Sequence, residues 1–391
     1  MNTDDRPLAA TLRRFVDAGE VAGAALRFRQ RGALVEEAVI GWADIERRRE
    51  VTARSVFRQA SLTKPVVAVA ILQLVETGLV RLDDPVAVFI PSYASTMVAE
   101  GVPTNWSSPS EAGAGMRIVD AIRPVTIRDL LTHSSGLGHG PHSAGLIDAV
   151  RMPGQTLAER VDAYTTIPAD AQPGESAGYS PQVGFDVLGR VVEVCTGVDL
   201  HSALRAGILD PLGMTDTTFV LTAEQHRRLV TLYGLVDGVL RDESASPDAL
   251  SMTPVGLASG AAGLYGTAWD FDRFARMLGG GGELEGTRIL KRSSVEAMSA
   301  ERSAGARAMG HGLEWGLGVI VEVVGNDVKA PGAWGWSGAW GSHLVIDSVN
   351  RTTLVLMVNR SDIGGAGSAP SRELEQVALR EYGRVHARTR H

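Results

Sequence analysis

Residues 57–65 read FRQASLTKP, and the apolar run VVAVAILQLV follows at once over residues 66–75. Because apolar side chains fall on almost every side of a helix with this sequence, the helix is predicted to be buried. Ser61 stands where the helix begins, and Lys64 lies one turn further on the same face. The two residues are either a helix cap with an exposed first-turn neighbour or a nucleophile with its base.

The chemical interpretation of Ser61 and Lys64 rests on their position at a buried helix start. Free backbone N–H groups and the positive end of the helix dipole favour an anion that develops at Ser61. Burial removes water from the Lys64 ammonium, which favours the neutral amine and lets it accept the Ser61 proton. The S-x-x-K pattern also arises by chance, so the pair alone still favours the helix cap.

The composition restricts the class of protein. The chain has 391 residues, 44% hydrophobic and 21% charged, which is ordinary for a soluble globular protein. Its formal net charge of −7 argues against nucleic acid or an anionic membrane as the main partner. The single cysteine, Cys195, allows no internal disulfide, and the sequence has no CxxC motif or Cys/His cluster to hold zinc. We therefore expect no metal and no cofactor.

The N-terminus shows no targeting pattern. MNTDDRPLAATLRRF has two early aspartates and lacks a basic segment followed by an apolar one. The longest apolar run, residues 65–72, stops at Gln73, well short of the roughly 18 residues of a membrane span. These features predict a cytoplasmic protein.

Strand patterns occur at both ends of the chain, and helix patterns lie between them. After a predicted helix over 8–18, two strands over 23–29 and 33–40 flank a tight turn. Three strands and a closing helix are predicted near the other end, over residues 317–324, 342–346, 352–358 and 373–384. This order predicts an α/β (α+β) fold: an antiparallel sheet from both chain ends, flanked by helices, plus a mostly helical region.

The predicted domain organisation follows from the same order. Residues 1–91 and 216–391 are expected to form the α/β sheet domain and residues 92–215 the mostly helical domain, with the active site between them. Helices are predicted in the second domain over residues 127–132, 157–166 and 183–196.

Several glycine-rich or proline-rich segments are predicted as loops. Loops over 92–116, including the stretch 103–115, and over 136–155 are expected to shape a pocket, and periodicity predicts no conformation for them. The run GGGG over 279–282 lacks the strand–loop–helix context and the Lys-Ser/Thr of a phosphate loop. No nucleotide site is predicted from this run.

Two further stretches carry candidate site residues. Tyr179 follows a Pro/Gly turn and precedes an apolar helical segment, so its phenol either points into a cleft or packs at the helix start. Residues 332–347 read GAWGWSGAWGSHLVID and lead into a strand. Glycine lets the backbone approach a ligand closely, and an edge strand can offer an N–H to an oxyanion. The tryptophans of this region either fill a core or line a pocket.

Taken together, these stretches resemble the serine β-lactamase and penicillin-binding-protein superfamily, whose nucleophile lies in an S-x-x-K motif. Within it the chain is most similar to the class C-like branch, closest to the family VIII carboxylesterases. The landmarks are FRQASLTKP (57–65), LDDPVAVFIP (82–91), IRDLLTHSSGL (127–137), GYSPQVGFDVLGRVVE (178–193), DPLGMTDTTF (210–219), SGAAGLYGTAWDFDRFARML (259–278) and WGWSGAWGSHLVID (334–347). The resemblance implies a β-lactamase/transpeptidase-like fold.

The resemblance also implies a role for each matching residue. Ser61 would be the acylated nucleophile and Lys64 its partner in proton transfer. Tyr179 matches the tyrosine of the family's Y-x-N position and would act with Lys64 as general base, then as acid toward the leaving group. The backbone N–H groups of Ser61 and Ala339 would form the oxyanion hole. The substrate pocket would include the third motif, which is K-T-G in β-lactamases, and a neighbour: Trp336, Ser337, Gly338 and Trp340.

Two departures from the family pattern favour esters over β-lactams. The Y-x-N asparagine, which helps to bind the β-lactam amide side chain, is absent, because Ser180 and Pro181 follow Tyr179. The K-T-G lysine, a cation suited to the β-lactam carboxylate, is replaced by Trp336. Family VIII esterases resemble this pattern, and an aromatic wall favours a neutral, apolar group.

The predicted function is therefore that of a serine hydrolase, a carboxylesterase that cleaves small esters through an acyl-enzyme at Ser61. With the same three residues the chain could be an acyltransferase, or an amidase or peptidase acting on D-amino acid amides. A weak β-lactamase and a non-catalytic penicillin-binding-like module are further alternatives. The sequence predicts neither the natural substrate nor the oligomeric state.

Three histidines, His133, His139 and His142, lie close together in the sequence. No carboxylate accompanies them at helical spacing, so we expect a structural, hydrogen-bonded role for His133 rather than a metal site.

Overall fold

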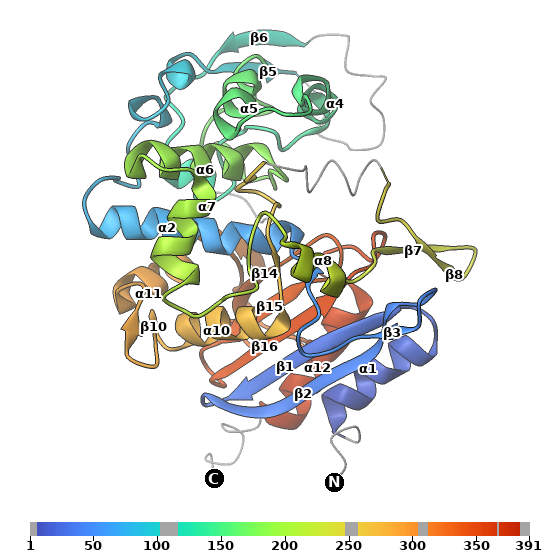
Figure 1. Ribbon diagram of the computed structural model, residues 1–391. Helices are drawn as coiled ribbons and strands as arrows, with labels where there is room; N and C mark the ends of the chain where they lie inside the picture. The colour runs from blue at the N-terminus through green and yellow to red at the C-terminus, as the bar shows by residue number, and fades with distance from the viewer. Residues whose placement is uncertain (1–5, 102–115, 247–256, 304–311, 366, 384–391) are drawn as a thin grey trace.

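The computed structural model describes residues 6–101, 116–246, 257–303, 312–365 and 367–383. An eight-stranded antiparallel sheet has the strand order β12-β13-β14-β15-β16-β1-β2-β3 (Figure 1). Its strands are β1 (Gly23–Gln30), β2 (Ala33–Asp44), β3 (Arg49–Glu50), β12 (Leu313–Trp315), β13 (Ile320–Glu322), β14 (Trp334–Ser337), β15 (His343–Asp347) and β16 (Thr352–Val358). Strand β1 pairs with β16, with Leu26 opposite Leu356, so the two chain ends meet inside the sheet. The predicted antiparallel sheet from both chain ends is confirmed.

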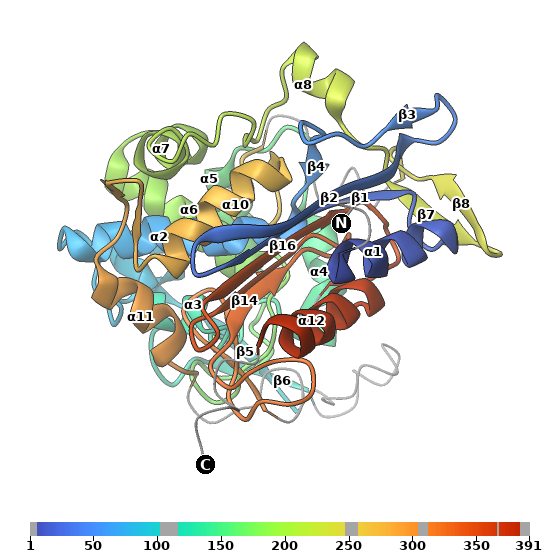
Figure 2. The same cartoon turned by 90° about the horizontal axis from the view of Figure 1, so that it is seen from below.

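Helices cover both faces of this sheet (Figure 2). Helices α1 (Pro7–Asp17) and α12 (Ala369–Tyr382) pack on one face, and α10 (Ala268–Gly279) packs on the other. The core beneath α1 and α12 is formed by buried apolar side chains that include Leu8, Leu12, Leu26, Phe28, Leu354, Leu356, Leu374 and Val377. Strand β1 is buried on both faces, whereas β2 alternates between buried and exposed residues from Glu36 to Ile40.

Helix α2 (Thr63–Glu76) lies between the sheet and a group of helices in the upper part of Figure 1. Eleven of its residues are buried, from Thr63 to Leu74, as its almost uniformly apolar sequence predicts. The group above it includes α5 (Leu157–Tyr164) and α6 (Val183–Thr196), and α6 contacts α3 (Ile127–Leu131) and α7 (Leu200–Leu204). The predicted helices over 127–132, 157–166 and 183–196 are thus observed.

Two segments that were expected to be loops contain regular structure. Within 92–116, strand β5 (Met97–Glu100) pairs with β6 (Arg117–Asp120), and within 136–155, α4 (Pro141–Val150) is helical. A four-residue strand and a helix with a glycine inside it carry too few periodic positions to be recognised from sequence. The predicted loop over 103–115 lies outside the described residues.

Shorter elements complete the described chain. They are β4 (Phe57–Arg58), β7 (Tyr233–Val236), β8 (Val239–Asp242), β9 (Tyr265–Gly266), β10 (Glu283–Leu284), β11 (Thr287–Arg288), α8 (Ala223–Arg228) and α11 (Arg292–Ala300). Strand β4 pairs with β9 directly before the SLTK sequence, which ties the start of α2 to the segment before α10.

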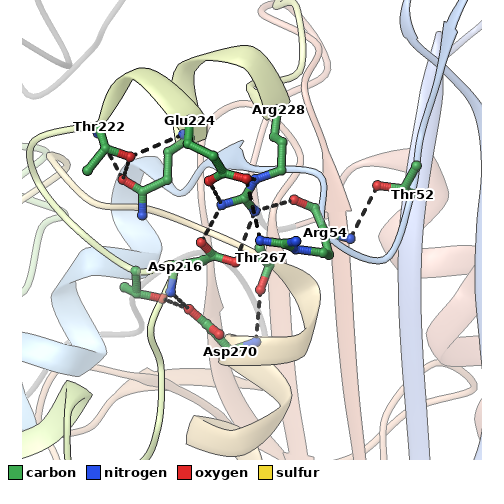
Figure 3. Close-up of polar contacts among 10 residues, drawn as sticks. Thr52, Arg54, Asp216, Thr222, Glu224, Arg228, Thr267 and Asp270 are labelled. Carbon is green, nitrogen blue, oxygen red and sulfur yellow. Dashed lines mark hydrogen bonds and ion pairs between the residues drawn. The ribbon is translucent and has the colours of Figure 1, made fainter.

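A polar network connects α8 to the first turn of α10 (Figure 3). Arg228 contacts the carboxylates of Asp216 and Glu224 at 2.9 and 2.8 Å. Asp270, which is 1% exposed, accepts hydrogen bonds from the Asp216 N–H at 2.9 Å and from Thr217 Oγ1 at 2.7 Å. Burial raises the pKa of Asp270 to about 6, and the nearby Asp216 acts in the same direction.

We predict that Asp270→Asn changes how stability depends on pH. The carboxyl has a pKa of about 6 in the fold, against about 3.9 in an unfolded chain, so its ionisation favours unfolding. The wild-type free energy of unfolding therefore falls by up to about 3 kcal/mol from this group as the pH rises from about 4 to about 6. Asparagine cannot ionise, so urea unfolding across this range should show the variant gaining on the wild type as the pH rises.

Asp237→Asn is the matched control, because Asp237 is exposed in the β7–β8 turn. Its free energy of unfolding should run parallel to that of the wild type. Parallel curves for Asp270→Asn as well would contradict the raised pKa.

Candidate active site

Ser61 lies in a short 3-10 helix, η2 (Ala60–Leu62), that leads directly into α2. The residue before it, Ala60, has a φ of +45°, a left-handed conformation that costs a residue with a β-carbon on the order of 1–3 kcal/mol. Thr63 Oγ1 donates to the Ala60 carbonyl at 2.8 Å and accepts from the Leu264 N–H at 3.1 Å. The strained turn is therefore held in place by hydrogen bonds on both sides of Ser61.

The structure brings together the three residues predicted to carry the chemistry. Tyr179 Oη donates to Ser61 Oγ at 2.7 Å, and Lys64 Nζ donates to the same oxygen at 3.1 Å. The three residues come from η2, α2 and the loop that precedes α6. One serine oxygen thus lies within hydrogen-bond reach of two groups that can exchange a proton.

Lys64 is 1% exposed, and its ammonium has a complete set of acceptors. Besides Ser61 Oγ, Nζ donates to the carbonyls of Pro181 at 2.7 Å and Ala261 at 2.9 Å. Three acceptors match the three N–H donors of an ammonium, whereas a neutral amine has only two. The site therefore favours the cation, in contrast to the neutral amine that burial alone led us to expect. The Pro181 carbonyl provides an acceptor at the position where the Y-x-N asparagine is missing.

Asp186, in the first turn of α6, holds the segment that carries the Ala261 carbonyl. Its Oδ1 accepts from Ser259 Oγ at 2.6 Å and from the Ala261 N–H at 3.3 Å, and its Oδ2 accepts from Tyr164 Oη at 3.1 Å. Burial and, after it, Asp186 raise the pKa of Tyr164, so this phenol remains a donor. Asp186 thus positions one acceptor of Lys64 without touching the lysine.

An aromatic cluster surrounds Tyr179. The Trp315 ring stacks on the Tyr179 ring with centroids 5.5 Å apart, and the Trp336 ring lies 5.1 Å away in a tilted orientation. Both tryptophans are buried, and neither indole N–H has an acceptor among the described residues. Sequence reasoning did not select Trp315, although the four tryptophans between residues 315 and 340 drew attention to this region.

His133 packs against the same cluster, with its ring centroid 4.2 Å from that of Trp315. Its Nδ1 accepts from the Ser180 N–H at 3.2 Å, which confirms the hydrogen-bonded role expected for it. Burial, followed by the nearby Lys64 and His139 charges, lowers the pKa of His133 well below its ordinary value. A neutral ring that accepts at Nδ1 therefore supports the backbone next to Tyr179.

The end of β14 approaches the nucleophile through Gly338. A β-carbon at this position would lie 2.3 Å from the Gln59 carbonyl oxygen, so only glycine fits. Ala339 packs against a small apolar cluster of Ala60, Leu232 and Trp340. Because Ala60 directly precedes Ser61 in the chain, Ala339 lies close to the nucleophile. The Ala339 N–H donates to no acceptor among the described residues, as an oxyanion donor requires before substrate binds.

Ser337 faces the opposite side of β14 from Trp336, as alternation along a strand requires. Its Oγ lies 2.6 Å from His343 Nδ1. On the other side of the ring, His343 Nε2 lies 2.7 Å from Glu375 Oε1 on α12, but the angle of this contact is not that of a hydrogen bond. Burial by itself raises the pKa of Glu375, but His343 and Lys329 outweigh it and hold that pKa below its ordinary value. This chain of contacts ties β14 to α12, and the predicted place of Ser337 in the substrate pocket remains a prediction.

Within the described ranges, no group of three or more His, Cys, Asp or Glu side chains is arranged to hold a metal ion. In the same part of the chain, no helix combines the length and the apolar character that crossing a membrane would need.

Comparisons with known proteins identify the family of the chain. Residues 8–378 match the family model described as Beta-lactamase. The chain is 34% identical over 377 residues to protein Rv1367c of Mycobacterium tuberculosis, covering 92% of this chain and 90% of that protein. It is 30% identical over 379 residues to esterase EstB of Burkholderia gladioli, covering 89% and 88%.

A solved structure has the same fold. EstCE1, described as a hydrolase with promiscuous acyltransferase activity, superposes with a TM-score of 0.79 at 21% identity, covering 96% of this chain and 98% of that one. The predicted β-lactamase/transpeptidase fold is confirmed. Together with the match over residues 8–378, these similarities show that the chain belongs to the beta-lactamase family of serine hydrolases.

Proposed function

We propose that this protein is a carboxylesterase that hydrolyses small esters through an acyl-enzyme at Ser61. The observation that carries the proposal is the placement of Ser61 Oγ, 2.7 Å from Tyr179 Oη and 3.1 Å from Lys64 Nζ. A serine oxygen between a phenol and a buried cation can lose its proton as it attacks a carbonyl carbon.

Before acylation, Tyr179 releases its phenol proton to water, so that the hydrogen bond between Tyr179 and Ser61 reverses and the phenolate accepts. Ser61 Oγ then attacks the ester carbonyl carbon, and its proton passes to the Tyr179 phenolate. The Lys64 ammonium, 5.1 Å from the Tyr179 ring centroid, balances the negative charge of the phenolate. The N–H groups of Ser61 and Ala339 bind the oxyanion. When the tetrahedral intermediate collapses, the ester C–O bond breaks, and Tyr179 returns the proton to the departing alkoxide, which leaves as the alcohol.

Deacylation repeats these proton transfers with water. The Tyr179 phenolate takes a proton from a water molecule as the water oxygen attacks the acyl carbonyl carbon. Collapse of the second intermediate breaks the bond to Ser61 Oγ, and Tyr179 gives its proton to that oxygen. The products are the free acid and the original enzyme.

The aromatic cluster supports esters over β-lactams. Trp336 is 4% exposed and offers a neutral indole N–H that lacks an acceptor among the described residues. A neutral donor on an apolar wall suits an uncharged ester better than the carboxylate of a β-lactam. The 30% identity to esterase EstB of Burkholderia gladioli also supports an ester substrate.

Ser61→Ala tests the nucleophile. Turnover of short-chain nitrophenyl esters should fall at least about 10³-fold, because the variant cannot form the acyl-enzyme. A serine-directed phosphonate should add covalently to the wild type but not to the variant, as measured by intact mass. Ser202→Ala, on exposed surface in α7, is the matched control and should match the wild type in both assays.

The same assay separates the ester hypothesis from its alternatives. Ester turnover that survives in Ser61→Ala would refute the proposal. Faster turnover of D-amino acid amides or β-lactams than of esters would favour the amidase or β-lactamase alternative. Transfer of the acyl group to an added alcohol in preference to water would identify an acyltransferase.

Tyr179→Phe tests the proton carrier. The ring and its stacking on Trp315 are kept, so KM should change little, whereas kcat should fall about 10²–10⁴-fold, as expected when general acid–base catalysis is lost. Tyr382→Phe, which removes a phenol on α12 that bonds to Glu36, is the control and should leave kcat unchanged. A kcat for Tyr179→Phe within threefold (about 0.6 kcal/mol) of the wild type would assign the proton transfer to another group.

Asp186→Asn tests the positioning of Lys64. An amide keeps the size of the carboxylate but replaces an acceptor oxygen with a donor, which disrupts the bonds that hold residues 259–261. We expect kcat to fall about tenfold with KM little changed, and the pH–rate profile to shift, because Lys64 loses a fixed acceptor. The variant could instead lose activity only because less of it folds. In that case kcat per folded molecule and the pH–rate profile would be unchanged, and the role of Asp186 would be purely structural.

A further inference from the structure

A cavity of about 630 Å³ lies at the end of the sheet away from the nucleophile. It is enclosed by the β1–β2 turn, the β15–β16 turn, the end of α10 and helix α11, which share one end of the sheet (Figures 1 and 2). Strand β14 reaches it only through Trp334, its first residue, and none of the proposed catalytic residues lines it. Its volume falls within the range of small-molecule sites, about 300–1,000 Å³.

Arginine dominates the polar lining of this cavity. Five arginines contribute: Arg29, Arg31, Arg276, Arg292 and Arg351. Two of them are neutralised, Arg29 by Asp272 at 2.7 Å and Arg276 by Glu285 at 2.8 Å. The other three have no carboxylate within ion-pair distance among the described residues. The chain as a whole has a net charge of −7, whereas the three unpaired arginines make the charge at this cavity positive.

Two of these arginines lie on turns that are joined through the backbone. The Arg31 N–H donates to the Arg351 carbonyl at 2.7 Å, which fastens the β1–β2 turn to the β15–β16 turn. Both residues have a positive φ, 51° and 55°, so each sits at the tip of its turn. Two cationic residues on adjoining turns raise the local positive potential, which attracts an anion.

The third unpaired arginine lies over the glycine run. A β-carbon at Gly281 would lie 2.8 Å from Arg292 Cζ, and Gly281 has a φ of +74°. The guanidinium of Arg292 therefore lies against Gly281, where the positive φ disfavours any residue with a side chain. The run of four glycines lacks the pattern of a phosphate loop. Its glycines are explained instead by the positive φ of Gly281 and Gly282 and by the close approach of Gly282 to the Leu290 carbonyl.

Two carboxylates also line the cavity, Asp347 and Glu296. Asp347 Oδ1 accepts from the Val349 and Asn350 N–H groups, both at 2.9 Å, so this carboxylate is engaged in the β15–β16 turn. Glu296 is exposed on α11. Neither lies within ion-pair distance of Arg31, Arg292 or Arg351, so the three guanidinium groups keep their donors for a ligand.

We infer that this cavity binds a small phosphorylated molecule with two or more phosphate groups. Guanidinium groups match phosphate oxygens through paired N–H donors, and three of them on separate segments supply enough donors for more than one phosphate group. The hydroxyls of Ser299, Ser348 and Thr352 on the lining add neutral donors. Trp334 and Ile346 at its base provide apolar contact for the rest of the ligand.

Isothermal titration of the full chain with tripolyphosphate, ATP and adenosine tests this site. Tripolyphosphate and ATP should bind and adenosine should not, because the phosphate groups supply the affinity. Arg292→Ala and Arg351→Ala should each weaken ATP binding at least about tenfold, the effect of losing charge-assisted hydrogen bonds. Tighter binding of ATP than of tripolyphosphate would show that the adenosine part also contacts the cavity. Equal binding would show that the phosphate groups alone are recognised.

Arg227→Ala is the matched control, since Arg227 is exposed on α8 and does not line the cavity. It should leave ATP affinity within about twofold of the wild type. Absence of binding by both phosphate compounds would overturn the inference. So would an equal loss of affinity in Arg227→Ala, or adenosine binding as tightly as ATP.

Discussion

The buried ammonium of Lys64 is the constraint on which the rest of the site depends. A charge that is 1% exposed is stable only if its donors are satisfied, and its three acceptors come from three separate segments of the chain. The Ala261 acceptor is held in turn by Asp186, and Tyr179 shares the Ser61 oxygen with the lysine. Satisfying one cation thus fixes the loop before α6, the segment before α10 and the start of α2.

Sequence reasoning identified the parts of the fold and site that local patterns encode. The apolar run after Ser61 predicted a buried helix, and strands at both chain ends predicted the sheet, because each pattern extends over many residues. It did not find the carbonyls of Pro181 and Ala261, since a backbone acceptor leaves no mark in residue identity. Asp186 had a recognisable signal, an acid in the buried first turn of an apolar helix, but the residues that it holds for Lys64, Ser259 and Ala261, lie more than 70 positions away.

In the third motif, residue identity predicted the role of one residue, Gly338, better than that of its neighbour Ser337. Gly338 was predicted because it matches a family glycine, and the structure gives the physical reason, a close approach to the Gln59 carbonyl. Ser337 was grouped with its neighbours as a pocket residue, yet its hydroxyl contacts His343 on the far side of the strand. Successive side chains of a strand face opposite sides of the sheet, so neighbouring residues of one motif need not line the same pocket.

The pairing of β1 with β16 has a consequence for how the protein is made. Leu26 and Leu356 face each other inside the sheet, so this pair cannot form until all the residues between β1 and β16 have been synthesised. Contacts between such distant segments are slow to form, and unpaired strands stay exposed to aggregation in the meantime. Ser61, Lys64 and Tyr179 are synthesised long before Ala339, which enters through β14 of the same sheet. The nucleophile therefore exists on the growing chain before its second oxyanion donor does, and the site cannot be complete until β14 and the segment after it have been synthesised.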